Sequence, residues 1–169
     1  MMGKLVHAAL GCACASLAIS IIAIALPYWV YSETSFSWGS SVIYYGLWTT
    51  CNQSETRGQQ EPAVCASIVT GPHFIALTRA FELTGLLFLA IAVILGFLMF
   101  SATLRNPAFL CVAGGLAAAA GPFMILGAII FGARTVGLEE KGATLHVGFA
   151  FAVLSGVLAV AAGVMFLGS

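Results

Sequence analysis

The sequence contains very little charge. Only 7% of its 169 residues are charged, and six basic and six acidic side chains give a net charge of zero. Soluble domains carry about 25% charged residues and roughly 45–50% apolar ones, whereas 61% of this chain is hydrophobic. This composition excludes a soluble core and predicts a membrane protein. A neutral chain has no basic field to attract nucleic acid or anionic lipid.

The sequence also lacks the motifs of an enzyme. It contains no nucleotide-binding loop, hydrolase elbow or Ser/His/Asp constellation, so we predict no catalytic residue, cofactor or small-molecule substrate. Cys12 and Cys14 do not form a C-x-x-C pair, and they lie within an apolar run, as Cys111 does, which favours core packing. Palmitoylation is the alternative for Cys111. His73 and His146 have no cysteine or acid at ligand spacing, so no metal site is predicted; a zinc or pH site is the alternative.

Long apolar runs dominate what remains. A spanning helix needs roughly 20 mostly apolar residues, and four segments qualify: 5–26, 77–100, 109–131 and 147–167. The chain has no Gly/Ser linker and no repeat of 20–50 residues, so residues 1–169 are expected to form one tetraspan domain. A cleaved signal peptide is the alternative for the first run, which is longer than a typical signal-peptide core. We predict an all-α membrane protein, a bundle of four transmembrane helices with two loops on one side, at 27–76 and 132–146.

The basic residues do not decide how this bundle is oriented. Four spans place both termini on one side of the membrane. The positive-inside rule would favour the wrong side, because only two basic residues flank the face with the termini, while four lie on the other. These residues are Lys4 and Arg105 on the first face, and Arg57, Arg79, Arg134 and Lys141 on the second.

The chemistry of the first loop provides the orientation instead. Cys51 and Cys65 are the only cysteines in polar sequence and predict a disulfide, which implies an oxidising compartment. Closing this loop would stabilise the fold by about 3 kcal/mol; two free thiols are the alternative. The triplet Asn52-Gln53-Ser54 is a sequon and predicts N-glycosylation at Asn52. Both features place the loop outside, so we expect a plasma-membrane protein with cytoplasmic termini.

The first loop also carries strand signals. The stretches "SSVIYYGLWTT" and "YWVYSE" are rich in β-branched and aromatic residues, and "TRGQQEP" is typical of a turn. We predict a small extracellular antiparallel β-sheet resting on the bundle, with Trp29 and Trp48 anchored at the membrane surface. A plain interfacial aromatic belt is the alternative for Trp38, Tyr44 and Tyr45.

Several of these residues together form a recognisable pattern. Trp29 is followed by Gly46-Leu47-Trp48, then by Cys51 and Cys65. This order resembles the W…GLW-x-x-C…C signature of the claudin superfamily, which includes peripheral myelin protein, the epithelial membrane proteins, the lens fibre membrane protein and the calcium-channel gamma subunits. The order of spans and loops also resembles that group.

Further features refine the resemblance. Arg79, in "ALTRAFEL", is similar to the arginine that the superfamily carries at the start of its second helix. The short chain and brief second loop look most like the epithelial membrane, myelin and lens branch. The spacing from Cys51 to Cys65 is wider than is usual in the superfamily, and the first loop is nearer to claudin length.

Charged residues near the first loop suggest two roles. Arg79 and Glu82 are three residues apart on one helix face and are predicted to form an ion pair that fixes helix depth. A gating or partner-binding role is the alternative. Glu55, Arg57 and Glu61 lie at the predicted tip of the sheet and are expected to face a partner.

The sequence therefore predicts a non-enzymatic protein that supports cell–cell contact or membrane organisation through a disulfide-braced sheet. Its expected partners are membrane lipid and other membrane proteins in cis or trans, including itself or a channel. The resemblance implies two further alternatives: an auxiliary, gamma-like subunit of an ion channel or receptor, and a claudin-like paracellular barrier or pore.

Overall fold

Four long helices form the body of the protein. The computed structural model describes residues 2–37, 39–56, 59–69, 71–99, 107–138 and 143–169. The helices are α1 (Met2–Ala25), α2 (His73–Leu98), α3 (Pro107–Leu138) and α4 (Val147–Leu167), and each is long and apolar enough to cross a membrane. The predicted fold class, a four-helix membrane bundle with a small antiparallel sheet, is confirmed. The helices α2 and α3 extend beyond the expected spans at the end that carries the sheet.

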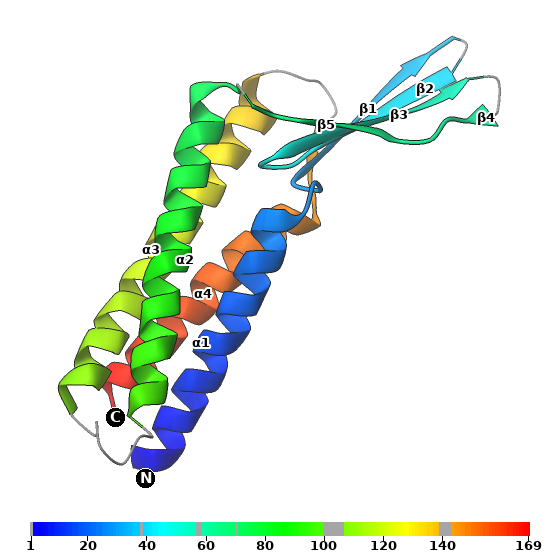
Figure 1. Ribbon diagram of the computed structural model, residues 1–169. Coiled ribbons are helices and arrows are strands. Elements are labelled where there is room, and N and C mark those ends of the chain that lie inside the picture. Colours follow the sequence, from blue (N-terminus) through cyan, green and yellow to red (C-terminus); the bar gives the residue numbers. More distant parts are fainter. Residues whose placement is uncertain (1, 38, 57–58, 70, 100–106, 139–142) are drawn as a thin grey trace.

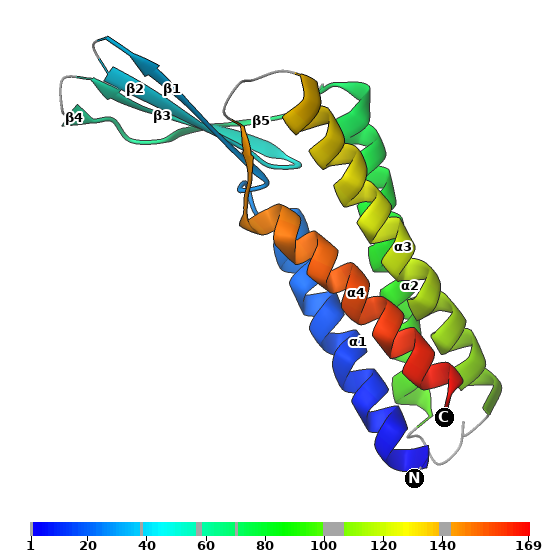
Figure 2. The ribbon, with the colours of Figure 1, turned by 180° about the vertical axis from the view of Figure 1, so that it is seen from behind.

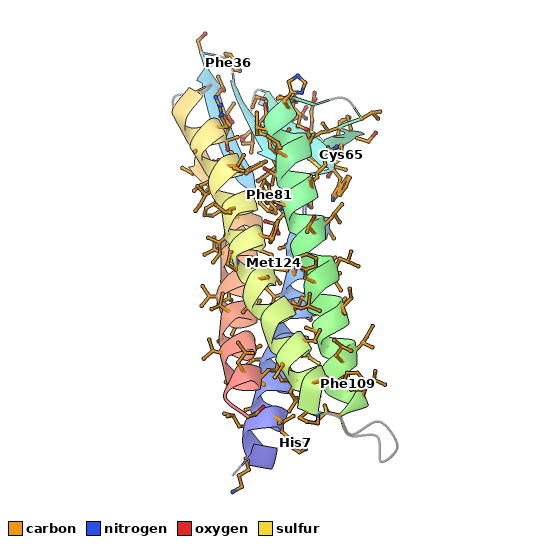
Figure 3. The ribbon with its side chains drawn as sticks, turned by 90° about the vertical axis from the view of Figure 1, so that its left-hand side faces the viewer. His7, Phe36, Cys65, Phe81, Phe109 and Met124 are labelled. Carbon is orange, nitrogen blue, oxygen red and sulfur yellow. A yellow bond between two sulfur atoms is a disulfide. The ribbon has the colours of Figure 1, made fainter. Side chains whose placement is uncertain are left out.

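The helices pack as neighbours in the order α1, α4, α3 and α2. Contacts are extensive between α2 and α3, between α3 and α4, and between α1 and α4, and they are sparse between α1 and α2. Both termini lie at the end of the bundle opposite the sheet (Figure 1). Figure 3 shows the same polarity, with His7 at one end of the molecule and Phe36 at the other.

Glycines allow α3 and α4 to approach closely. A Cβ atom on Gly121 would lie 2.5 Å from the carbonyl oxygen of Gly156. A Cβ atom on Gly163 would lie 2.5 Å from the backbone nitrogen of Ala118. Small residues permit such contacts in lipid, where association depends on close packing. The small residues of these two helices therefore serve packing within the bundle.

The buried residues form two apolar clusters with polar side chains between them. One cluster, towards the termini, is built from all four helices, and the second lies beneath the sheet around Trp29, Leu47 and Phe131. Buried polar residues occupy the helix segments between the clusters: Ser16, Ser20, Thr78, Glu82 and Ser155. The middle of the bundle is therefore more polar than either end of its core.

Six strands form one antiparallel sheet at the end of the bundle (Figure 2). Its order is β4-β3-β2-β1-β6, with β5 also pairing with β3. The strands are β1 (Val30–Phe36), β2 (Gly39–Tyr45), β3 (Thr49–Thr56), β4 (Gln59–Gln60), β5 (Val64–Ser67) and β6 (Thr144–Leu145). Because β6 precedes α4 and pairs with β1, both loops contribute to the same sheet.

The stretch "SSVIYYGLWTT", which carries strand signals, contains parts of two strands, because β2 ends at Tyr45 and β3 begins at Thr49. The backbone nitrogen of Gly46 donates to the carbonyl oxygen of Thr49 over 2.9 Å and closes a hairpin. Residues 46–48 therefore form a turn between the two strands, although the residues on either side have high strand propensity. In the predicted turn "TRGQQEP", Gln59 and Gln60 form the short strand β4. Arg57 and Gly58 of the same stretch lie outside the described residues.

Candidate functional site at the junction of sheet and bundle

Trp29 is buried where the chain leaves α1 and enters β1. Its side chain has no exposed surface, and its Nε1 donates to the carbonyl oxygen of Ala23 over 2.7 Å. Its ring packs edge-on against Phe131 of α3, with centroids 5.1 Å apart. A Cβ atom on Gly148, in the first turn of α4, would lie 2.6 Å from the indole ring. Trp29 therefore joins three helices to the sheet, and the expected anchoring of this ring at the membrane surface is wrong.

The Gly46–Leu47 turn fits against the end of α1. A Cβ atom on Gly46 would lie 2.5 Å from the Cα of Pro27, a contact that only a glycine avoids. Leu47 has no exposed surface and belongs to the same core cluster as Trp29. The turn between β2 and β3 is thus packed into the bundle, which fixes the angle of the hairpin.

Arg79 links two segments of the sheet to α2. Its Nε donates to the carbonyl oxygen of Leu47 over 2.8 Å, and one Nη donates to that of Ile68 over 3.0 Å. Its Cζ lies 4.6 Å from the centroid of the Trp48 ring, a cation–π geometry. The Trp48 side chain remains 39% exposed. One guanidinium group therefore holds the β2–β3 turn, the end of β5 and an aromatic ring together.

The expected ion pair between Arg79 and Glu82 is not formed in the structure. Glu82 is 1% exposed, and neither carboxylate oxygen has a hydrogen-bond partner. It lies against α3, where a Cβ atom on Gly127 would be 3.1 Å from its Oε1. Arg79 instead donates to two backbone carbonyls, those of Leu47 and Ile68. The three-residue spacing carries no information about those carbonyls.

The cysteine pair and the sequon occupy adjacent positions in β3. Cys51 and Cys65 are opposite each other in the register of β3 and β5 and form a disulfide. Asn52 is exposed, and its Oδ1 accepts a hydrogen bond from Ser41 Oγ over 3.0 Å. This hydrogen bond uses the amide oxygen of Asn52, whereas a glycan would attach to the amide nitrogen, so the two do not compete for one atom.

The acidic residues predicted at the tip are on the surface. Glu55, in β3, and Glu61, just after β4, are exposed. Glu61 Oε2 accepts a hydrogen bond from Ser54 Oγ over 3.0 Å, and its backbone nitrogen donates to the Ser54 carbonyl over 2.9 Å. Arg57 lies outside the described residues. In Figure 1 this part of the sheet lies away from all four helices.

A cavity of about 390 Å³ lies between one face of the sheet and the helices α2 and α3. Val30, Tyr45 and Thr50 contribute from the strands, while Ile75 and Phe131 contribute from the helices. Ligand sites of this kind are concave and mostly apolar. Within the described part of the chain, no three His, Cys, Asp or Glu side chains gather where a metal ion could bind.

A cluster of rings, which the sequence pattern did not predict as a unit, covers the opposite face of the sheet near the bundle. Tyr28 and Tyr44 meet edge-on at 5.1 Å between centroids, and Tyr31 lies 5.5 Å from Tyr44. The ring of His146 lies 6.2–6.4 Å from all three tyrosines. The hydroxyl of Tyr31 donates to Glu33 over 2.6 Å, which raises the pKa of this tyrosine and keeps it neutral. We call Tyr28, Tyr31, Tyr44 and His146 the tyrosine–histidine cluster.

Its components are separated in the sequence, which explains why it was missed. Tyr31 and Tyr44 are partners in the register of β1 and β2, and Tyr31 also pairs with Thr144 of β6. His146 directly follows β6, so the second loop brings it to the tyrosines of the first. The only signal was the enrichment of the first loop in aromatic residues, which does not show which of them meet.

Comparison with known proteins agrees with this geometry. The profile of the PMP-22/EMP/MP20/Claudin family matches residues 2–166, which covers nearly the whole chain. No individual curated protein matches the sequence. The match includes all four helices, the sheet and the residues that join them. The chain belongs to the PMP-22/EMP/MP20/Claudin family.

Proposed function

We propose that this protein is a non-enzymatic protein of the plasma membrane that supports cell–cell contact or membrane organisation. The observation that carries the proposal is the attachment of the sheet. Trp29, Leu47 and Arg79 fix its base to the bundle, while its other end lies away from the helices. A sheet held in one orientation presents the same surface on every molecule, and such preorganisation lowers the entropic cost of binding.

The disulfide and the sequon support an external position for the sheet. A stable disulfide is typical of an oxidising compartment, and N-glycosylation occurs on the same side of the membrane. Both termini lie at the opposite end of the bundle and would then be cytoplasmic. The exposed residues Glu55 and Glu61 would face another membrane protein in cis or trans.

The contact function is tested by reversing the charge at the tip. Cells that express the protein should cluster, or should concentrate it where they touch. The double variant Glu55→Lys and Glu61→Lys should reduce clustering to about the background level at equal surface expression, because charge complementarity governs specificity and encounter. Lys4→Glu is the matched control, since Lys4 is exposed at the opposite end.

Three outcomes contradict the contact function. If cells with the unaltered protein neither cluster nor concentrate it at contacts, the function is not adhesion. A channel that co-purifies with the protein and changes its current would indicate an auxiliary subunit. A change in epithelial resistance with polymerised strands would indicate a paracellular barrier or pore.

Glycosylation at Asn52 gives an independent test of orientation. Asn52→Gln and Ser54→Ala should each remove a glycosidase-sensitive mass, because both destroy the sequon. Ser54→Thr should retain that mass, because threonine also serves in the sequon. Equal electrophoretic mobility of all four proteins before and after glycosidase would refute glycosylation at this position.

A further inference from the structure

The tyrosine–histidine cluster presents aromatic surface together with a negative charge. Tyr28 is 40% exposed, Glu33 and His146 are exposed, and Tyr31 and Tyr44 are half-buried. The negative faces of aromatic rings attract cations, and quaternary ammonium groups are bound by such sets of rings. Glu33 adds a carboxylate beside Tyr31. The chemistry of the cluster therefore suits an organic cation better than an anion or a metal ion.

The position of the cluster limits where that cation comes from. Tyr28 lies three residues beyond the end of α1, and His146 is the N-cap of α4. Both helices are long and apolar enough to span the membrane, so the cluster lies at the level where a span meets the surface. Ile21, Ile22 and Val147 are exposed nearby on these two helices and are 52%, 48% and 44% accessible. An apolar surface suited to acyl chains thus lies next to an aromatic surface suited to a cation.

We propose that the tyrosine–histidine cluster binds the choline headgroup of a phospholipid in the membrane leaflet next to the sheet. The trimethylammonium group contacts the tyrosine rings and is balanced by Glu33, while the acyl chains lie along the exposed surfaces of α1 and α4. A choline lipid meets both requirements, since it carries a permanent cation and hydrocarbon chains in one molecule. The contact would link the orientation of the sheet to the lipid around the ends of α1 and α4.

The proposal is tested with purified protein in a maltoside detergent by native mass spectrometry. The probes are dioleoyl phosphatidylcholine and dioleoyl phosphatidylglycerol at equal concentration, which differ in the headgroup alone. We expect the unaltered protein to retain the choline lipid roughly fivefold better, as cation–π and charge contacts of this kind predict. Glu33→Gln and Tyr44→Leu should each remove most of this preference.

Two matched variants separate the cluster from general effects on the sheet. Glu55→Gln removes an exposed acid of β3, and Phe36→Leu removes an exposed ring at the other end of β1; both should keep the preference. An intact Cys51–Cys65 disulfide on a non-reducing gel shows that each variant has folded. Glu33→Gln alters only an exposed side chain, so it tests the site even if Tyr44→Leu does not fold.

Three results would overturn the proposal. Equal retention of the two lipids would mean that the rings form an interfacial belt without headgroup selectivity. If Glu33→Gln and Glu55→Gln reduce the preference equally, the cation binds elsewhere. If soluble glycerophosphocholine displaces the lipid at equal concentration, the acyl chains contribute nothing and the occupant is a soluble choline compound.

Discussion

Replacing Arg79 by glutamine should lower the free energy of unfolding by about 4 kcal/mol. Hydrogen bonds to charged groups contribute about 1.5–3 kcal/mol each, and an exposed cation–π contact contributes roughly 0.5–1 kcal/mol. Arg79 makes two such hydrogen bonds, to the carbonyl oxygens of Leu47 and Ile68, and one such ring contact, to Trp48. The change should appear as a lower midpoint of thermal unfolding in detergent and as poorer delivery to the cell surface.

The matched control for Arg79 is Arg134→Gln. Arg134 is an exposed arginine in the part of α3 near the sheet, so its replacement removes the same charge at the same end of the bundle. Hydrogen exchange distinguishes the two variants further. Loss of Arg79 should increase exchange in Thr49–Thr56 and Val64–Ser67 more than in the helices. Equal destabilisation by the two substitutions would mean that the carbonyl contacts of Arg79 contribute little.

Lysine at position 79 should recover less than half of the loss. A lysine retains the charge, but its ammonium group lacks the planar fork that reaches two carbonyls while stacking on a ring. Trp48→Leu combined with Arg79→Gln should cost less than the sum of the single effects, because the two residues share one contact. Additive effects would show that the guanidinium and the indole act independently.

Local patterns explain why much of this fold is visible in the sequence. Long apolar runs identify spans directly, since lipid requires about 20 apolar residues that satisfy their own backbone hydrogen bonds. β-Branched and aromatic residues identify the strands of the first loop, and Cys51 and Cys65 stand out because no other cysteine lies in polar sequence. Each of these features depends on residues close together in the chain.

The parts that escaped prediction depend on residues far apart in the chain. β6 comes from the second loop. Its two residues are too few to show a strand pattern in the sequence, and they form a strand only by pairing with β1. A tryptophan at the end of a span is expected at the membrane interface. Trp29 is instead buried in a core cluster with Phe131 and Ala152, which lie more than 100 positions away in the chain. The partners of Arg79 are backbone carbonyls, which every residue possesses, so no sequence pattern identifies them.

Glu82 is expected to be the reverse case, in which a substitution stabilises the protein. Its carboxylate is 1% exposed between α2 and α3, and neither oxygen has a hydrogen-bond partner. An uncompensated charge in the interior costs about 3–5 kcal/mol, and a buried polar group without a partner about 1–3 kcal/mol. Glu82→Met, which keeps a similar side-chain length, should therefore raise the free energy of unfolding by about 3 kcal/mol and raise the midpoint of thermal unfolding.

The outcome of this substitution decides what Glu82 does. Leu83→Met is the control, because Leu83 is 43% exposed on the same helix and its replacement should change little. Gly127→Ala should destabilise the unaltered protein, since the added Cβ would lie 3.1 Å from Glu82 Oε1 and 3.2 Å from Phe81 Cβ. If Glu82→Met unfolds more easily than the unaltered protein, the carboxylate is stabilised by a bound group. If the variant is more stable but no longer clusters cells, the protein retains a costly buried acid because its function needs one, which is the usual reason for an ionisable residue within a membrane.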